Sequence, residues 1–337
     1  MKAVGYQKSL PISDPDSLVD IELPAPVPTG RDLLVRVSAV SVNPIDTKMR
    51  MRAQAEPGQH KVLGWDASGV VEGAGPECKF FKPGDAVFYA GALTRQGTNS
   101  ELHLVDERLV GPKPGTLDHA RAAALPLTAI TAWEALFDRL DITRAVPGAA
   151  CALVIVGAAG GVGSIAIQLA KQAGGVTVIA TASRPESIAW ARSLGADHVI
   201  DHAHPIQPQI AALGVGAPGF VFSTTKTDAH FDGIVETIAP QGRFCLIDDP
   251  EPIDVRKLKR KSVSLHWELM FTRSLFATPD MSEQHRLLAK VSALVDEGKV
   301  RSTFADHFGR ITAENLRRAH ALIESGKSRG KIVLEGF

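Results

Sequence analysis

The stretch Leu153-Val154-Ile155-Val156-Gly157-Ala158-Ala159-Gly160-Gly161-Val162-Gly163-Ser164-Ile165-Ala166 is the part of the sequence that decides the fold. An apolar run of strand length leads into a glycine-rich turn, which opens a segment of small and apolar residues typical of a helix. Glycine permits backbone dihedrals, and a close approach by another group, that a Cβ atom would prevent. The helix N-terminus offers unpaired N–H groups and a positive dipole end to a diphosphate. We therefore expect Gly160, Gly161, Val162 and Gly163 to hold the diphosphate of a dinucleotide.

The spacing of these glycines is Gly-x-x-Gly-x-x-Gly, one residue longer than the commonest dinucleotide fingerprint. The alternative interpretation is a strand-to-helix turn in which glycine serves packing alone. The strand before the turn, the helix after it and a second apolar run at 176–180 favour the nucleotide site.

The end of that second run indicates which nucleotide is bound. The fingerprint usually places a carboxylate about 20 residues further on, where it binds the ribose 2′-hydroxyl of NAD. Here the run leads into Thr181-Ala182-Ser183-Arg184, with no carboxylate at its tip. Arginine offers forked donors to a 2′-phosphate, so the pattern favours NADPH over NADH. The alternative is that Arg184 is an exposed loop cation.

Strand-like and helical patterns alternate after about residue 150, which predicts a parallel sheet with crossover helices. The expected strands are 152–156, 176–180, 198–201, 219–222 and 243–247, and the expected helices are 164–172 and 186–194. The first 115 or so residues are rich in β-branched residues between Pro and Gly turns, as in a β-rich unit. Helical spacings at 118–140, interrupted by Pro126, and at 281–297 and 313–325 precede a last strand at 331–334. We expect a nucleotide-binding domain (121–265) inserted between two parts (1–120 and 266–337) of a β-rich domain.

Composition excludes several classes of partner. Lys and Arg together number 37, as do Asp and Glu, so no overall field favours nucleic acid or an anionic membrane. The sequence shows neither the apolar core of a signal peptide nor a run of transmembrane length. The three cysteines are scattered, which argues against a disulfide framework. We expect a cytoplasmic protein.

Several stretches occur in a fixed order that is familiar from one protein family. They are 41–47 (SVNPIDT), 64–71 (GWDASGVV), 81–87 (FKPGDAV), 125–129 (LPLTA), the glycine turn, 194–197 (LGAD) and 330–334 (GKIVL). Over essentially its whole length the chain resembles the quinone oxidoreductase branch of the medium-chain dehydrogenase/reductase superfamily. It is also similar to zinc-type alcohol dehydrogenase-like proteins that lack the zinc ligands. The resemblance implies an α/β protein with a Rossmann-type parallel sheet domain inserted in a GroES-like catalytic domain, and a homodimer.

The resemblance also implies roles for individual residues. Asn43 and Thr128 would lie near the nicotinamide and the substrate, while Trp65 and Phe271 would line the pocket or belong to the core. Some relatives carry a tyrosine where this chain has Lys48, which is either a replacement proton donor or an exposed lysine. The cofactor residues implied beyond the glycine turn are Ser183, Arg184, His202, Ser223, Thr224, Asp248 and Lys331.

The same positions argue against a zinc ion. Catalytic zinc in alcohol dehydrogenases needs cysteine and histidine ligands in a tetrahedral arrangement. This chain has Asn43 at the first ligand position, Gly64-Trp65-Asp66 in place of Gly-His-Glu, and no ligand in the segment 125–128. We expect no metal.

Without a metal, the oxidation of an alcohol has no Lewis acid to stabilise an alkoxide, whereas an activated acceptor needs less help. The sequence therefore predicts an NADPH-dependent reductase that transfers hydride to quinones or α,β-unsaturated carbonyls. Two alternatives remain open, namely an alcohol or aldehyde dehydrogenase with an unrecognised metal and a nucleotide-binding protein without turnover. The loops 50–60 and 267–280 decide the acceptor, which the sequence does not identify.

Overall fold

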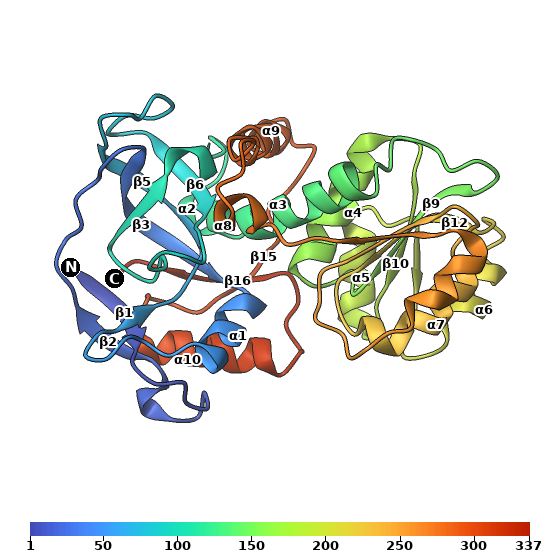
Figure 1. The fold of residues 1–337 in the computed structure, drawn as a ribbon, viewed down its shortest axis with the longest axis horizontal. Helices are drawn as coiled ribbons and strands as arrows, with labels where there is room; N and C mark the ends of the chain where they lie inside the picture. The colour runs from blue at the N-terminus through green and yellow to red at the C-terminus, as the bar shows by residue number, and fades with distance from the viewer. The chain divides into compact units, whose positions relative to one another are not determined.

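A computed structural model describes residues 1–337 of the chain. The chain forms two compact units (Figure 1). Unit 1 comprises Met1–Ile130 and Phe271–Phe337, and unit 2 comprises Thr131–Met270. A parallel-sheet unit is therefore inserted between two parts of a β-rich unit, which confirms the expected fold class. No helix combines the length and the hydropathy that crossing a membrane requires.

Unit 2 contains a six-stranded sheet in the order β11-β10-β9-β12-β13-β14, in which every neighbouring pair is parallel. The strands are β9 (Ala150–Val156), β10 (Thr177–Thr181), β11 (His198–Ile200), β12 (Pro218–Ser223), β13 (Arg243–Leu246) and β14 (Ser264–Trp267). The helices are α4 (Gly161–Ala173), α5 (Pro185–Ser193), α6 (Ile206–Ala212) and α7 (Thr227–Thr237), with a π-helix at Glu134–Arg139 and a 3-10 helix at Val255–Lys261. The strand order reverses direction between β9 and β12, where such sheets bind nucleotides.

The core of unit 2 follows from its apolar strands. Val154 and Val156 of β9, Val221 of β12 and Phe244 of β13 are buried together with Ile234 of α7. Helices cover parallel sheets on both faces, so the strands need apolar side chains on both sides. This explains why β9 reads as a continuous apolar run.

Unit 1 contains a seven-stranded sheet and a three-stranded sheet. The first has the order β15-β16-β3-β5-β6-β8, with β7 also paired to β3, and the second has the order β2-β1-β4. The strands are β1 (Lys2–Tyr6), β2 (Val19–Glu22), β3 (Asp32–Val42), β4 (Lys61–Val62), β5 (Asp66–Ala74), β6 (Ala86–Ala90), β7 (Leu102–Asp106), β8 (Val110–Pro112), β15 (Phe304–His307) and β16 (Lys331–Glu335). The helices are α1 (Pro44–Arg52), α2 (His119–Ala123), α8 (Thr272–Leu275), α9 (Glu283–Asp296) and α10 (Ala313–Glu324), while α3 (Pro126–Trp133) continues from unit 1 into unit 2.

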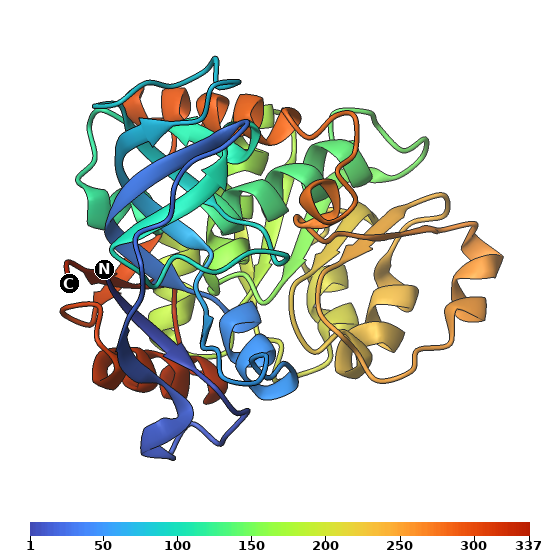
Figure 2. The same ribbon diagram turned by 60° about the vertical axis from the view of Figure 1, so that its left-hand side comes forward.

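Two helix contacts fix the outer parts of unit 1. Helices α1 and α10 pack side by side (Figure 1). Helix α9 packs against β8, and Figure 2 shows it lying along the edge of the β-rich unit.

The ends of three neighbouring strands of unit 1, β16, β3 and β5, lie together at the same end of the larger sheet. Strand β3 pairs antiparallel with β16, with Val42 opposite Ile332, and antiparallel with β5, with Ser41 opposite Asp66. The end of β3 therefore lies beside the starts of β16 and β5. This pairing brings Asn43, Asp66 and Lys331 together from distant parts of the sequence.

The structure contains elements that the hydrophobic patterns did not predict, including α1, α6, α7, α8, β14 and β15. Helix α1 is the clearest case, because its buried residues are Asp46, Thr47 and Arg50. A helix that buries a polar face lacks the apolar stripe on which such a prediction depends. The predicted break of the 118–140 pattern at Pro126 is confirmed, since α2 ends at Ala123 and α3 begins at Pro126.

Candidate functional site

The glycine turn connects β9 to α4 in unit 2. Gly157 has a φ of +79°, which L side chains rarely adopt, and a Cβ on Gly163 would lie 2.5 Å from the Ala158 Cα atom. These two glycines are therefore required by the backbone itself. A Cβ on Gly160 would find its nearest neighbour at 3.5 Å, so this position is open.

The N-terminus of α4 fits a diphosphate. Gly160 occupies the N-cap position and has no side chain to cap the first turn. Gly160, Gly161 and Val162 are each partly exposed. The first N–H groups of a helix have no intrahelical partners, so they remain available to an anion.

The ends of β10 and β11 carry the residues expected near a 2′-phosphate. Ser183 is exposed, and the Arg184 side chain is 39% exposed with its Nε atom 3.4 Å from a carboxylate oxygen of Glu186. His202 is partly exposed, and its Nδ1 atom lies 2.8 Å from Oγ1 of Thr181. The Thr181 hydroxyl oxygen also accepts a hydrogen bond from the Gly157 N–H at 3.1 Å. The glycine turn and His202 are thus joined through one hydroxyl group.

The residues expected at the ends of β12 and β13 are engaged with one another. The Ser223 side chain is fully buried, and its hydroxyl lies 2.7 Å from that of Thr227. Thr227 also donates from its N–H to Oδ2 of Asp248 at 2.9 Å. The Thr224 hydroxyl donates to the Val156 carbonyl at 2.8 Å. These contacts hold the loop after β12 in place.

In unit 1, Asn43, Asp66 and Lys331 form a buried polar cluster, and none of the three is more than 3% exposed. The Lys331 ammonium lies 3.0 Å from Oδ2 of Asp66 and also donates to the carbonyl oxygens of Val42 and the Asn43 side chain. The second Asp66 oxygen accepts from the Leu127 N–H at 2.7 Å. All three donors of the ammonium are therefore used inside unit 1, although the resemblance suggested that Lys331 approaches the cofactor.

A second carboxylate lies next to this cluster. Asp46, 1% exposed, accepts a hydrogen bond from the Asn43 N–H at 2.6 Å and so closes the start of α1. Burial, which disfavours the charged form, is the main reason that the pKa of Asp46 is raised to about 7. The Lys331 ammonium opposes this rise.

The three expected catalytic residues differ in the exposure and the hydrogen bonds of their side chains. Asn43 donates its side-chain N–H groups to Asp66 at 2.8 Å and to the Ser41 carbonyl at 3.3 Å. Thr128 is 2% exposed and donates its hydroxyl to the Leu125 carbonyl at 3.1 Å. Lys48, on α1, is partly exposed.

The two expected aromatic pocket residues lie in the interior of unit 1. Trp65 and Phe271 are 1% and 2% exposed, and their rings meet edge to face with centroids 6.1 Å apart. The indole N–H of Trp65 donates to the Ala92 carbonyl at 3.2 Å. Both rings therefore pack as core residues.

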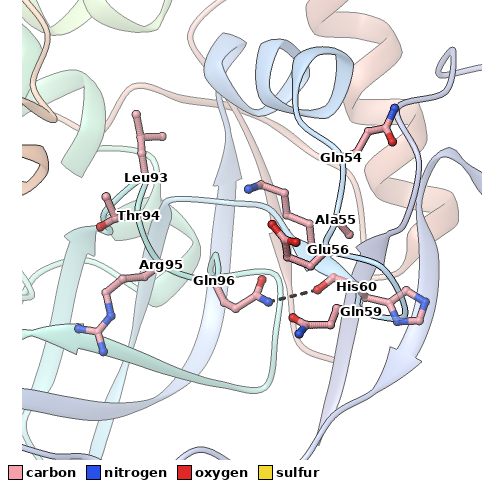
Figure 3. A pocket seen from close by; sticks show the side chains of 10 residues that line it. Gln54, Ala55, Glu56, Gln59, His60, Leu93, Thr94, Arg95 and Gln96 are labelled. Carbon is pink, nitrogen blue, oxygen red and sulfur yellow. Dashed lines mark hydrogen bonds between the residues drawn. The ribbon is translucent and has the colours of Figure 1, made fainter.

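Unit 1 also has a surface cavity of about 240 Å³ between the loop after α1 and the loop after β6 (Figure 3). Its lining is mostly polar and includes Lys61 and the carboxamide groups of Gln54, Gln59 and Gln96. Gln96 donates to the His60 carbonyl at 3.1 Å across the cavity wall. Part of the loop 50–60, which we expected to shape the acceptor pocket, lines the cavity, but neither Trp65 nor Phe271 does.

The sequence did not predict the pairing of Asp66 with Lys331. The two residues lie far apart in the sequence, and no local pattern links them. A signal existed only for Asp66, since a carboxylate at the start of a strand of mostly small and apolar residues needs a partner when it is buried.

Comparison with known proteins places this geometry in a family. The family profile described as "Alcohol dehydrogenase GroES-like domain" matches residues 29–124, and the one described as "Zinc-binding dehydrogenase" matches residues 161–290. The chain is 38% identical to a zinc-type alcohol dehydrogenase-like protein of Staphylococcus aureus (strain MSSA476), over 99% of each protein. The chain belongs to the medium-chain dehydrogenase/reductase superfamily. It is an oxidoreductase of this superfamily, with the expected GroES-like and Rossmann-type domains.

Two solved structures of this superfamily extend the comparison. One is a Rhizobium etli CFN 42 protein assigned provisionally as a zinc-dependent alcohol dehydrogenase, which is 62% identical, covers 100% of this chain and 98% of its own, and has a TM-score of 0.98. The other is the quinone oxidoreductase of Coxiella burnetii, which is 26% identical over 100% of this chain and 99% of its own, with a TM-score of 0.80.

The names of the Staphylococcus aureus and Rhizobium etli proteins imply zinc, but the residues of this chain do not fit the ion. The polar cluster offers one carboxylate, Asp66, whose two oxygens already accept hydrogen bonds from Leu127, Asn43 and Lys331. A zinc ion there would lie beside an ammonium group and would lack the cysteine and histidine ligands that zinc prefers. No group of three or more His, Cys, Asp or Glu residues in the chain is arranged to hold a metal ion.

Proposed function

We propose that the chain is an NADPH-dependent reductase that transfers hydride to quinones or α,β-unsaturated carbonyl compounds. The observation that carries this proposal is the Lys331–Asp66 ion pair, in which an ammonium group occupies the polar cluster of unit 1. Because the Lys331 ammonium already occupies this cluster, we propose a reaction that needs no Lewis acid. Quinones and α,β-unsaturated carbonyls meet this requirement, since the negative charge that develops on hydride transfer is delocalised onto their oxygen.

The proposed cofactor site is in unit 2. Bound NADPH would supply the hydride. The N-terminus of α4, which has no capping side chain, would hold the diphosphate of the cofactor. Arg184, Ser183 and His202 are proposed to contact the 2′-phosphate, and Thr224 and Asp248 to order the loop beside the ribose. The absence of a carboxylate at the tip of β10 supports NADPH rather than NADH.

The acceptor site is proposed to involve unit 1. Of the three proposed catalytic residues, Lys48 is the one with a partly exposed side chain, so we assign it the hydrogen bond to the acceptor oxygen. Asn43 and Thr128 are buried and donate hydrogen bonds to other protein groups, so we propose that they position the surrounding backbone. The proton that completes the reduction is proposed to come from water.

The experiment is NADPH oxidation by the purified protein with 9,10-phenanthrenequinone, 1,4-benzoquinone and short-chain enones, with and without a metal chelator. We expect turnover that survives the chelator and is faster with NADPH than with NADH. Loss of activity in the chelator, together with NADP⁺ reduction by simple alcohols, would instead favour a zinc-dependent alcohol dehydrogenase, the function that the names of the relatives suggest. Tight NADPH binding without turnover on any acceptor would favour a nucleotide-binding protein.

We also propose that two copies of the chain associate through β14, the last strand of the unit 2 sheet. An unpaired strand edge presents N–H and C=O groups that can pair with another strand. Trp267 of β14 is 56% exposed and Leu269 is 47% exposed, so apolar surface accompanies this edge. A second copy would cover both features at once.

A further inference from the structure

Four basic side chains gather near the carboxyl ends of β10, β11 and β12. They are Arg184, His202, Lys226 and His230, which we call the basic cluster. The rings of His202 and His230 lie 5.8 Å apart between centroids, although one follows β11 and the other belongs to α7. Sequence analysis identified Arg184 and His202 but neither Lys226 nor His230, whose helix it did not predict.

His202 is held in place by the glycine turn. Its Nδ1 atom lies 2.8 Å from the Thr181 hydroxyl oxygen, which accepts the Gly157 N–H at 3.1 Å. The imidazole is therefore linked to the loop that would bind the diphosphate. A phosphate elsewhere on the same nucleotide would lie within reach of this part of the sheet.

Lys226 is held in an uncommon backbone conformation. Its φ of 49° and ψ of 42° are left-handed, which costs a residue with a Cβ about 1 kcal/mol or more. It occupies the N-cap position of α7 without a capping side chain and is exposed. Strain of this kind persists where the surrounding structure holds the residue in place.

Charges of both signs surround the two imidazoles, with Lys226 near both rings and Arg184 near His202. Burial lowers the pKa of His202, and Lys226 and Arg184 lower it further, while Asp201 opposes them. Burial also lowers the pKa of His230, together with His202 and Lys226, against Asp228 and Asp248. Asp248 is already bonded to Thr227. A dianion placed among these groups would make protonation of the rings more favourable.

We propose that the basic cluster binds the 2′-phosphate of NADPH, and that His202 and His230 take up a proton from solvent when this phosphate binds. Lys226 and His230 then join Arg184 in determining the preference for NADPH over NADH. The inference rests on the proposed function, because it needs a 2′-phosphorylated cofactor. The inference adds Lys226 and His230 to the residues proposed from the motif around Arg184, and it adds a dependence of binding on pH.

The dependence on pH has a definite sign. Protonated imidazoles attract the phosphate and neutral ones do not, so affinity for NADP⁺ decreases as pH rises, relative to affinity for NAD⁺. The 2′-phosphate also titrates near neutrality and loses its second charge in acid, so the histidine contribution must be separated by substitution.

The test is calorimetric titration of the full-length protein with NADP⁺, NAD⁺ and adenosine 2′,5′-bisphosphate in two buffers of different ionisation enthalpy. The difference between buffers gives the number of protons taken up. The variants are His230→Gln and Lys226→Asn, because asparagine tolerates the left-handed conformation. The control is Lys259→Asn, which removes an exposed lysine from the 3-10 helix at Val255–Lys261.

We expect wild-type protein to take up protons with NADP⁺ and the bisphosphate but not with NAD⁺, and His230→Gln to take up fewer. Lys226→Asn should weaken NADP⁺ about tenfold more than NAD⁺, the usual effect of losing one charge-assisted hydrogen bond. Lys259→Asn should match wild type.

Two outcomes would overturn the inference while leaving the proposed function intact. One is unchanged proton uptake in His230→Gln, and the other is an equal loss of NADP⁺ and NAD⁺ affinity in Lys226→Asn, in each case with quinone-dependent NADPH oxidation by wild-type protein. If wild-type protein binds neither nucleotide, the proposed function itself is wrong and the inference fails with it.

Discussion

The Lys331 ammonium lies 3.0 Å from Oδ2 of Asp66, in an ion pair whose side chains are 3% and 0% exposed. Removing one partner from such a pair leaves an unpaired buried charge, which is strongly destabilising. The pair also holds the Asn43 side chain and, through Asp66, the start of α3. We regard Lys331 as a positioning residue for this part of unit 1.

Lys331→Met should therefore destabilise the protein by about 3–5 kcal/mol. The matched control is Lys82→Met, because Lys82 pairs with Asp85 at 2.9 Å but is 81% exposed, and such surface pairs contribute less than about 1 kcal/mol. Denaturant unfolding followed by far-ultraviolet circular dichroism measures both. Similar losses in the two variants would show that the buried pair is not what stabilises this edge of the sheet.

Arg184→Asp should narrow or reverse the preference for NADPH, because the substitution replaces forked donors with a charge that repels the 2′-phosphate. The ratio of kcat/KM values for NADPH and NADH should fall about tenfold or more. Arg192→Asp, at an exposed site near the end of α5, makes the same charge change away from the glycine turn. An unchanged ratio in Arg184→Asp would remove the argument for NADPH.

Gly163→Ala should disrupt the glycine turn, since the new Cβ would lie 2.5 Å from Ala158 Cα and 2.7 Å from the Gly157 carbonyl oxygen. Backbone atoms cannot move aside as a flexible side chain can, so we expect a lower melting temperature and weaker NADP⁺ binding. Gly160→Ala meets its nearest atom only at 3.5 Å and should melt close to wild type. Equal melting temperatures for both variants would contradict the packing argument.

Acid should destabilise the protein through two buried histidines. Burial is the main cause that lowers the pKa of His320 to about 3 and of His103 to about 4, from the ordinary 6.5. The unfolded chain binds these protons at higher pH, so stability falls as pH drops below 6.5 towards 4. Asp46 acts in the opposite sense, because its raised pKa of about 7 makes the folded chain bind the proton more tightly.

Among these three groups, two protons favour the unfolded chain and one favours the folded chain, so together they lower stability by about 1 kcal/mol per pH unit between pH 6.5 and 4. His320→Leu should make the fall of stability with acid less steep, because it removes one of the two buried imidazoles that take up a proton on unfolding. The substitution breaks no hydrogen bond, since the His320 ring nitrogens have no partner. His204→Leu, at a side chain that is 74% exposed, should leave the slope as it is. Unfolding free energies across this pH range test the prediction, which fails if both variants keep the wild-type slope.

Trp267→Lys should weaken the proposed dimer by placing a charge on the exposed edge strand β14. Light scattering coupled to size-exclusion chromatography should show a shift from dimer to monomer as the protein is diluted. Val27→Lys, at another exposed apolar residue (75%), should keep the wild-type mass. A wild-type protein that is already a monomer would show that β14 is not an interface.

The parts of the fold that the sequence predicted have strong local patterns. The strand, turn and helix around Gly157–Gly163 could be read directly, since each step depends on neighbours in the chain. Helix α1 could not, because it buries Asp46, Thr47 and Arg50 rather than an apolar stripe. The same local reading identified Arg184, whose neighbours in sequence define the strand end, but missed His230 on the unpredicted α7.

By itself the sequence determined the superfamily, the first five strands of the unit 2 sheet and the glycine turn, because each is recorded by residues close together in the chain. Only the tertiary structure decided how the polar residues of unit 1 are used. The antiparallel pairing of β3 with β16 and β5 places Lys331 against Asp66 and Asn43, so these three side chains use their polar groups on one another. Such contacts depend on strand register, which no local pattern records.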